Sequence, residues 1–439
     1  MPHTTPASTH PANPDLAATL AFSLAAAPAG FIDDPYPWYA ALRRHAPVHR
    51  LAADSLLLTR CADLMAVYRH PGASSDKKRE FAPKYGPGSP LFEHHTTSLV
   101  FSDPPLHTRV RRLLTGALNQ RAVARIESGL IELVDGLIDR LATLSQPDLI
   151  RDFAARIPVE VIGSLLDVPR DEREPLQGWS IDILSALEPV PGATLLERGN
   201  RSVTDFLNYL RDLVARRRQQ PGDPEVDMLT RLILGETDGE RLSELELLHN
   251  CIFLLNAGHE TTTNLIGNGL EALMRHRDQL DRLVRDPALI GPAVEELLRF
   301  ESPLQLNNRL ATTAIDLPAD PITGRGVVTI EAGTFVTLGV GAANRDPEVF
   351  AEPDRLDIGR RPNPQLAFGH GAHACAGMNI ARLEARVAIG RLVARYPEIE
   401  SAAPPERDRR IRFRGFRTLP VVLNRPASTL WRETRCLDE

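Results

Sequence analysis

One cysteine, Cys375, stands in a segment rich in glycine and histidine, residues 368–377, that leads into a helical pattern over 378–396. At the start of a helix, unpaired backbone N–H groups and the positive end of the helix dipole favour a thiolate over a thiol. Glycines in such a segment allow sharp turns and the close approach of a bulky ligand. The residue types and their order therefore make Cys375 a candidate ligand.

Three interpretations of this segment compete. In the first, Cys375 is a buried structural thiol and the histidines are loop residues. In the second, His370, His373 and Cys375 bind zinc, although the sequence lacks the paired ligands typical of structural zinc sites. In the third, the order Phe-Gly-x-Gly-x-His-x-Cys-x-Gly resembles the haem-binding loop of the cytochrome P-450 family. Every fixed position of that pattern matches, so we expect a haem on the cysteine.

The resemblance implies haem b (iron protoporphyrin IX) with an axial thiolate from Cys375. His107 and Arg111 stand four residues apart, and therefore on one face of a predicted helix. Taken alone, this pair also suits a solvated basic face. In the family the corresponding pair binds the haem propionates, for which a guanidinium and an imidazole are suited. The other residues that the resemblance places against the cofactor are Arg309, Phe368, Gly369, His373 and Gly377.

A long apolar helix is predicted to start at Ser243, which forms a capping box with Glu246, and to run to residue 275. Its pattern breaks at Glu260 and Thr261, an acid and a β-branched alcohol that are unfavourable inside a buried helix. The Thr261 hydroxyl can bond to the carbonyl of Ala257, four residues back, and so open a groove for a small ligand.

These residues resemble the family's Ala-Gly-x-(Asp/Glu)-Thr element. The resemblance implies that Ala257 lies against the haem. It also implies that Glu260 and Thr261 are catalytic and deliver the protons with which the O–O bond of dioxygen breaks heterolytically. The alternative, an exposed acid followed by capping threonines, fits poorly because the preceding residues are so apolar.

Another predicted helix, 288–300, carries Glu296 and Arg299 three residues apart. Taken alone, they form an ordinary surface pair. They also resemble the family's Glu-x-x-Arg, with Arg355 as the third member of a network. We expect these three residues to hold the cysteine loop in place and to take no part in catalysis.

Candidate substrate contacts come from segments that the resemblance places beside the haem, although each residue also suits ordinary packing. An irregular stretch over 72–102 corresponds to the region that covers the pocket in the family, and a terminal hairpin is predicted over 413–419. A further hairpin is predicted from strand-like runs over 327–330 and 335–338. The candidates are Phe92, Val100, Leu304, Gln305, Asn307 and Phe416. Gln305 or Asn307 bonds either a polar group of the substrate or nearby backbone.

Composition restricts the class of protein. Hydrophobic residues make up 43% and charged residues 25% of the 439 residues, as in a globular protein with ample core. A formal net charge of -6 without a dominant basic run argues against nucleic acid as a partner. Scattered cysteines do not make a disulfide framework, which favours the cytoplasm. No basic segment precedes the weak apolar patch over 16–27, so we expect neither a signal peptide nor a membrane anchor.

The predicted fold is mainly α with small β-sheets. The resemblance implies the cytochrome P-450 fold, a single triangular helical domain with a long central helix over the haem. We expect a disordered lead-in rich in Ala, Pro and Thr over 1–30, a haem domain over 31–424 and a tail over 425–439. Prolines and a glycine in 180–198 predict a hinge between helices.

The expected function is that of a haem-thiolate monooxygenase. It would insert one oxygen atom from dioxygen into a small, largely apolar organic substrate by hydroxylation, epoxidation or O-dealkylation. No reductase domain is recognisable after residue 424, so electrons are expected from a separate ferredoxin and an NAD(P)H-dependent reductase. We expect a monomer without nucleic-acid or membrane partners. Two alternatives stay open: a peroxygenase driven by hydrogen peroxide, and a haem-binding sensor or recruitment protein without turnover.

Overall fold

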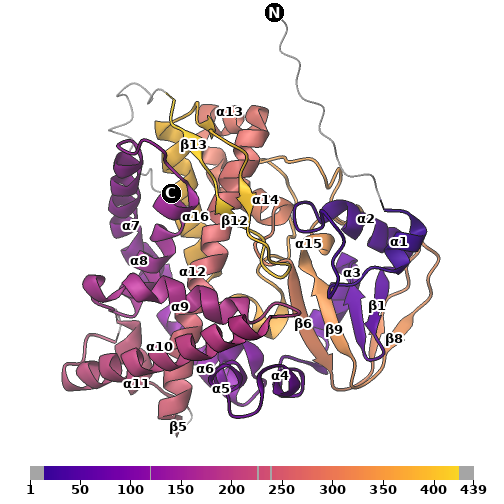
Figure 1. Cartoon of the computed structure of the whole chain (residues 1–439), viewed down its shortest axis with the longest axis horizontal. Coiled ribbons are helices and arrows are strands. Elements are labelled where there is room, and N and C mark those ends of the chain that lie inside the picture. The colour runs from indigo at the N-terminus through magenta and orange to yellow at the C-terminus, as the bar shows by residue number, and fades with distance from the viewer. Residues whose placement is uncertain (1–13, 119, 225–226, 238–239, 425–439) are drawn as a thin grey trace, which may run out of the picture.

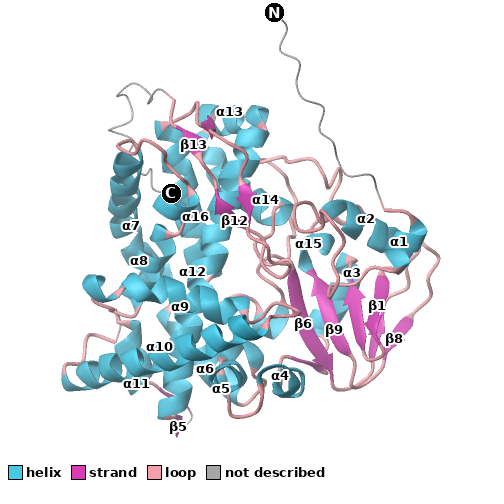
Figure 2. Ribbon diagram, in the orientation of Figure 1, coloured by secondary structure: helices cyan, strands magenta, loops and turns pink. Residues whose placement is uncertain are grey.

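A computed structural model describes residues 14–118, 120–224, 227–237 and 240–424. One sheet, with β1, β9 and β6, lies on one side of the molecule beside α1, α2 and α3, and most other helices lie on the opposite side, with β12 and β13 among them (Figures 1 and 2). The predicted tail over 425–439 and residues 1–13 of the predicted lead-in lie outside the described residues. Within the described part, no helix is both long enough and apolar enough to cross a membrane.

The larger sheet has the strand order β1-β2-β9-β6-β3. Strands β2 and β9 run parallel, and the other neighbours are antiparallel. Leu58 on β2 and Leu338 on β9 are fully buried, so one face of the sheet packs against the helices beside it. The bounds are Val48–Ala52 (β1), Ser55–Leu58 (β2), Ala73–Ser74 (β3), Leu306–Ala311 (β6) and Phe335–Gly339 (β9).

The other named strands of the described residues pair in two-stranded sheets. They are β4 (Glu236–Thr237) with β5 (Glu240–Arg241), β7 (Ile315–Leu317) with β8 (Val328–Ile330), β10 (Glu400–Ser401) with β13 (Val421–Val422), and β11 (Glu406–Arg407) with β12 (Phe416–Thr418). The predicted hairpin between 327–330 and 335–338 is wrong. Both runs are strands, but β8 pairs with β7, whereas β9 lies between β2 and β6.

The chain is ordered ahead of the predicted start of the domain. A short helix, α1 (Leu16–Leu20), is capped by the Asp15 side chain. Phe22 and Leu24 are buried beside Phe31 and Tyr39. The residues assigned to a disordered lead-in therefore include a packed segment from 14 to 30, and the domain boundary itself stays a prediction.

The stretch over 72–102 is more regular than its sequence predicts. It contains α4 (Lys78–Tyr85), α5 (Pro90–Thr97) and a 3-10 turn over Leu99–Phe101. Ser89 caps α5 by accepting the backbone N–H of Phe92, and proline occupies the first helical position, where its missing N–H costs nothing. The helices are short, which explains why hydrophobic periodicity did not reveal them.

Most of the chain is helical, as predicted, and the fold class is confirmed. The break predicted within 180–198 lies between α9, which ends at Ser185, and α10, which begins at Ala193. The α-helices outside those already named are α2 (Tyr36–His45), α3 (Cys61–Arg69), α6 (Leu106–Ala117), α7 (Gln120–Leu141), α8 (Arg156–Leu165), α9 (Glu174–Ser185), α10 (Ala193–Gln219), α11 (Met228–Leu234), α12 (Glu244–Arg275), α13 (Arg277–Arg285), α14 (Ile290–Phe300), α15 (Val340–Ala343) and α16 (Met378–Arg395). A π-helix covers Ile150–Ala154, and 3-10 turns cover Arg170–Glu172, Pro287–Leu289 and Gly371–His373.

Helix α12 runs through the middle of the helical part (Figure 1). It is 32 residues long and begins with the predicted capping box, in which Ser243 and Glu246 bond reciprocally. Almost all of its central residues are buried because α8, α9, α10 and α16 pack around it. This packing holds α12 against α16, the helix that follows the segment with Cys375.

Candidate functional site

The cysteine loop is a tight turn held by backbone geometry. Gly369 and Gly371 have φ values of 67° and 75°, in the left-handed region that favours glycine. A Cβ on Gly371 would lie 2.7 Å from the carbonyl oxygen of Tyr68, so this position also needs a residue without a side chain. The Cys375 N–H donates to the Phe368 carbonyl at 2.8 Å and closes the loop.

The Cys375 thiol is half-buried at the start of α16. Burial raises its pKa, while the Gly377 N–H and the charges of Arg111 and Arg382 lower it. The start of the helix favours the thiolate, whereas the loss of solvent around Cys375 favours the thiol. A positively charged metal ion bound to the sulfur would resolve the conflict, because coordination deprotonates a thiol.

One side of the loop is tied to two helices. The Arg382 guanidinium lies 4.7 Å from the centre of the Phe368 ring, a cation–π contact that fixes the first residue of the loop. The same guanidinium donates to Glu295 on α14, with Nε to Oε1 at 2.6 Å and Nη2 to Oε2 at 3.1 Å. Phe368, α14 and α16 are thereby held together.

Basic and imidazole side chains from three parts of the chain meet beside the loop. The rings of His107 on α6 and His373 in the loop lie 4.0 Å apart. Arg111, one turn after His107, donates from Nη1 to the Ala374 carbonyl at 2.6 Å. Arg309 on β6 is 6% exposed, and its charge, with those of His107 and Arg111, adds to burial in lowering the pKa of His373 to about 3. These four residues were predicted to act together, and the structure brings them together.

The arrangement fits a haem. Arg111 and Arg309 are positive and close enough to His373 to suppress its protonation, so the cluster suits the negative charges of two propionates. The buried Nε2 of His107 has no hydrogen-bond partner among the described residues, and a carboxylate oxygen would supply one. An added Cβ on Gly377, next to the cysteine sulfur, would meet no atom within 4 Å, which is space that suits a flat group.

The middle of α12 is open on one face. Ala257 is exposed and Gly258 and Thr261 are half-buried, although the residues around them are buried. The Thr261 hydroxyl donates to the Ala257 carbonyl at 2.9 Å, the bond predicted from the sequence. This bond diverts a helix carbonyl toward a side chain on the open face.

Glu260, by contrast, is 4% exposed. Burial raises the pKa of its carboxyl, and Arg410, which forms an ion pair with it, acts in the opposite direction. Arg410 bonds this carboxylate both as an ion pair and through a side-chain hydrogen bond. The charge of this buried acid therefore depends on one guanidinium, because a buried carboxylate without a partner is costly.

The Glu296–Arg299 pair on α14 is fully buried. Arg299 meets both carboxylate oxygens, with Nε to Oε2 at 2.7 Å and Nη2 to Oε1 at 2.8 Å. It also donates to the backbone carbonyls of Asn344 at 2.9 Å and Pro353 at 2.7 Å. The Asn344 side chain accepts the backbone N–H of Leu366 at 2.7 Å, directly before the cysteine loop. The pair is thus connected to the loop through Asn344.

The side chain of Arg355 is not the third member of this network. It is 61% exposed and pairs with Glu352 at 3.0 Å, while its backbone carbonyl accepts a bond from Arg299 at 3.2 Å. Arg360 takes the predicted place, with Nε 3.1 Å from each oxygen of Glu296. The prediction failed because the chain turns back toward α14 after Arg355, and that turn is not visible in the local sequence.

Two of the pocket candidates are already engaged. The buried Gln305 side chain donates to the Ser302 carbonyl at 2.7 Å, which is the backbone alternative left open by its sequence. Asn307 accepts from Arg309 at 3.3 Å and donates to the Tyr68 hydroxyl at 3.4 Å. Both amides therefore support neighbouring residues, and Asn307 supports the arginine of the basic cluster.

The remaining pocket candidates differ in their position. Phe416 belongs to strand β12 and lies under the Arg407 guanidinium, 3.7 Å from the ring centre, so it is part of the hairpin's body and not of its tip. Phe92, Val100 and Leu304 are half-buried. Their contact with substrate stays a prediction.

Comparison with known proteins identifies the family. The model for the family described as Cytochrome P450 matches residues 177–286 and 289–416. The chain belongs to the cytochrome P450 family. It is 41% identical over 375 residues to the vitamin D(3) 25-hydroxylase of Pseudonocardia autotrophica, which covers 85% of this chain and 89% of that enzyme. It is 38% identical over 408 residues to cytochrome P450 107B1 of Saccharopolyspora erythraea, covering 89% of this chain and 95% of that protein.

Solved structures agree with this placement. The crystal structure of P450BioI in complex with an acyl carrier protein ligated with hexadec-9Z-enoic acid superimposes with a TM-score of 0.82 at 34% identity. The match covers 90% of this chain and 100% of that chain. As a cytochrome P450, the chain is a monooxygenase-type oxidoreductase whose family uses haem with a cysteine thiolate as axial ligand.

Three arginines of this cytochrome P450 escaped the sequence analysis. They are Arg360, Arg382 and Arg410, which contact Glu296, the Phe368 ring and Glu260 respectively. Each meets a partner far away in the chain, so neither helical spacing nor strand alternation could reveal the pair. The presence of buried acids at 260 and 296 was the available signal, because a buried carboxylate requires a partner.

Proposed function

We propose that this cytochrome P450 binds haem b through the Cys375 thiolate and inserts one oxygen atom from dioxygen into a small, largely apolar organic substrate. The reaction would be a hydroxylation, an epoxidation or an O-dealkylation. The observation that carries the proposal is the convergence of His107, Arg111, Arg309 and His373 beside a half-buried cysteine.

In this proposal, some residues bind the haem and others support the loop that carries Cys375. His107, Arg111, Arg309 and His373 bind the propionates, and Arg382 holds Phe368 at the rim of the loop. The buried pair of Glu296 and Arg299 supports the loop through Asn344 and does not contact the cofactor. Bound haem supplies the activation of dioxygen, for which an axial thiolate favours cleavage of the O–O bond.

Proton delivery falls to Glu260 and Thr261. The Thr261 hydroxyl lies on the open face of α12, and its bond to the Ala257 carbonyl fixes the direction of its oxygen. Burial raises the pKa of Glu260, the preceding residue, which favours its uptake of a proton that it can pass toward Thr261. A substituted acid or alcohol would interrupt this transfer and leave electrons to reduce dioxygen without forming product.

The substrate is expected to be largely apolar. Relatives are named for vitamin D(3) hydroxylation, biotin biosynthesis and polyketide biosynthesis, so their substrates differ although their sequences are similar. The half-buried candidates Phe92, Val100 and Leu304 would give apolar contacts. A screen of terpenoids, fatty acids, aromatics and polyketides for a spin-state shift of the ferric protein would identify a substrate. We expect electrons from a ferredoxin and its NAD(P)H-dependent reductase.

The test compares Thr261→Ala with Thr263→Ala in the reconstituted enzyme. Thr263 makes the same type of bond, from its hydroxyl to the His259 carbonyl at 3.0 Å, but its side chain is buried. Thr261→Ala should bind substrate and consume NAD(P)H, yet release mainly peroxide, whereas Thr263→Ala should keep its yield of product per NAD(P)H. Equal yields in the two variants would contradict the relay.

The alternatives differ in observable ways. A peroxygenase would turn over with hydrogen peroxide alone at the rate of the reconstituted system. A sensor or recruitment protein would bind haem and show no substrate-dependent consumption of NAD(P)H with any redox partner. Either result would replace the monooxygenase proposal.

A further inference from the structure

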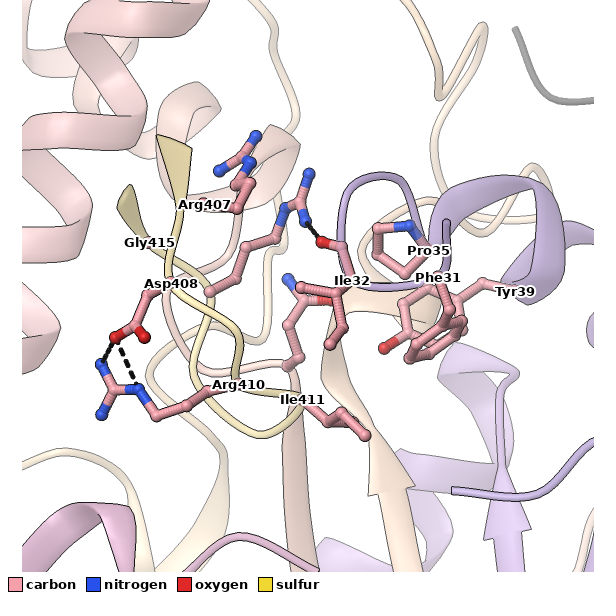
Figure 3. A pocket seen from close by; sticks show the side chains of 11 residues that line it. Phe31, Ile32, Pro35, Tyr39, Arg407, Asp408, Arg410, Ile411 and Gly415 are labelled. Atoms are coloured by element: carbon pink, nitrogen blue, oxygen red, sulfur yellow. Dashed lines mark hydrogen bonds and ion pairs between the residues drawn. The ribbon is translucent and has the colours of Figure 1, made fainter. Parts of the chain in front are cut away.

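The ion pair between Glu260 and Arg410 joins the central helix to the terminal hairpin. Arg410 lies in the loop between β11 and β12, and its Nη2 contacts Glu260 on α12. The same guanidinium donates from Nε to the carboxylate of Asp408 at 2.7 Å. Figure 3 shows Arg410 and Asp408 side by side, on the side of the hairpin that faces away from Phe31 and Tyr39. One guanidinium is therefore shared by a buried acid and a half-exposed acid.

The tip of this hairpin is fixed by the segment between α9 and α10. The Glu188 carboxylate accepts the backbone N–H of Ile411 at 2.8 Å and that of Arg412 at 3.3 Å. On the other side, the Arg412 guanidinium donates to Asn308 on β6 at 2.9 Å. Arg410 thus stands beside a tip that is held between the segment joining α9 to α10 and strand β6.

We propose that Arg410 is a positioning residue for Glu260, shared with Asp408, and that the terminal hairpin thereby controls proton delivery in this enzyme. The inference rests on the proposed role of Glu260 and Thr261. Pairing with Arg410 favours the ionised form of Glu260 and holds its carboxylate toward the hairpin. When Arg410 turns to Asp408, Glu260 loses its counter-charge, takes a proton from solvent and can pass that proton toward Thr261.

Besides burial, the charges that act most strongly on the Glu260 carboxyl among the described residues are those of Arg410, Asp408 and Glu188. Arg410 lowers the pKa of Glu260, whereas Asp408 and Glu188 raise it. Substitutions on the hairpin should therefore shift the protonation of Glu260 in opposite directions. Removing Arg410 should raise the pKa, and removing the charge of Asp408 should lower it.

The experiment compares Arg410→Gln, Asp408→Asn and Arg409→Gln in the ferric holoprotein. Infrared difference spectroscopy follows the carbonyl band of protonated Glu260 against pH, with Glu260→Gln to assign the band. An opposite charge in contact lowers a carboxyl pKa by about 1 to 3 units, so the titration of Arg410→Gln should move upward by about that amount. Asp408→Asn should move it downward. Arg409 is exposed, and Arg409→Gln should titrate as the wild type does.

Product yield per NAD(P)H against pH gives the functional readout. A proton donor must be protonated to act, so the yield should fall at a higher pH in Arg410→Gln and at a lower pH in Asp408→Asn, with KM for substrate unchanged. Arg410→Lys should stay close to the wild type. If Arg410→Gln folds poorly, Asp408→Asn still tests the inference, because its side chain is 35% exposed. Its Glu260 titration and its yield profile should both move to lower pH.

The outcomes separate this inference from the proposed function. Opposite infrared shifts with parallel shifts in yield support the inference. Shifts of the same sign, or none, in Arg410→Gln and Asp408→Asn overturn it, even if Thr261→Ala still loses coupling. Infrared shifts without any change in yield also overturn the control of proton delivery, and leave the pair as a structural contact.

Discussion

Replacing Arg360 by glutamine should loosen the support of the cysteine loop, whereas replacing Arg355 should not. The Arg360 side chain is 11% exposed and donates to Glu296, whose side chain is fully buried. Removal of one partner from a buried ion pair costs about 3 to 5 kcal/mol. Because Glu296 keeps Arg299, we expect the low end of that range, about 3 kcal/mol. Arg355 forms an exposed pair with Glu352, and such pairs contribute roughly 0 to 1 kcal/mol.

The assay is urea unfolding of the ferric protein, followed by circular dichroism of the helices and by Soret absorption of the haem. Arg360→Gln should unfold at a lower urea concentration than the wild type and lose haem before its helices unfold, because Glu296 is connected to the loop through Arg299 and Asn344. Arg355→Gln should retain the wild-type midpoint in both signals. Equal destabilisation by the two substitutions, or a larger effect at Arg355, would refute the assignment of Arg360 to the network.

Two further predictions concern single residues. Burial lowers the pKa of His95 to about 3, so the unfolded chain binds a proton below pH 6.5 that the folded chain does not, and stability is lost as pH falls. Between pH 7 and pH 5, His95 alone should lower the free energy of unfolding by about 2 kcal/mol. His95→Phe should remove this pH-dependent loss, whereas replacement of the exposed His45 should not change it. Unfolding measurements at both pH values test the difference. Gly371→Ala should destabilise the protein and lower its haem content, because a Cβ there would lie 2.7 Å from the Tyr68 carbonyl oxygen. Gly88→Ala has a similar φ of 80° but free space around the added atom, and equal losses in the two variants would contradict the clash.

Features encoded in short stretches were predictable from the sequence. The capping box at Ser243 and Glu246 starts α12 as expected, and Thr261 bonds to the Ala257 carbonyl. Both depend on residues three or four positions apart, whose contact follows from helix geometry alone. The turn of the cysteine loop belongs to the same class, since Gly369 has a positive φ that favours glycine.

Features that depend on distant segments were not predictable. Strands β8 and β9 are neighbours in sequence, yet they belong to different sheets because β9 joins β2 and β6. Arg360 and Arg410 reach buried acids only after the chain has turned back on itself. A buried carboxylate indicates that a cation must be near, but the sequence does not say which one. The family resemblance points to Arg355, whereas the structure places Arg360 against Glu296.

Absorption of the reduced protein under carbon monoxide tests the central claim most directly. If the Cys375 thiolate is the axial ligand, the wild type should show the strongly red-shifted Soret band that thiolate ligation produces, and Cys375→Ser should lose it while remaining folded by circular dichroism. A Soret band without that shift in the wild type, or a spectrum that the substitution leaves unchanged, would contradict the assignment of Cys375 as the ligand.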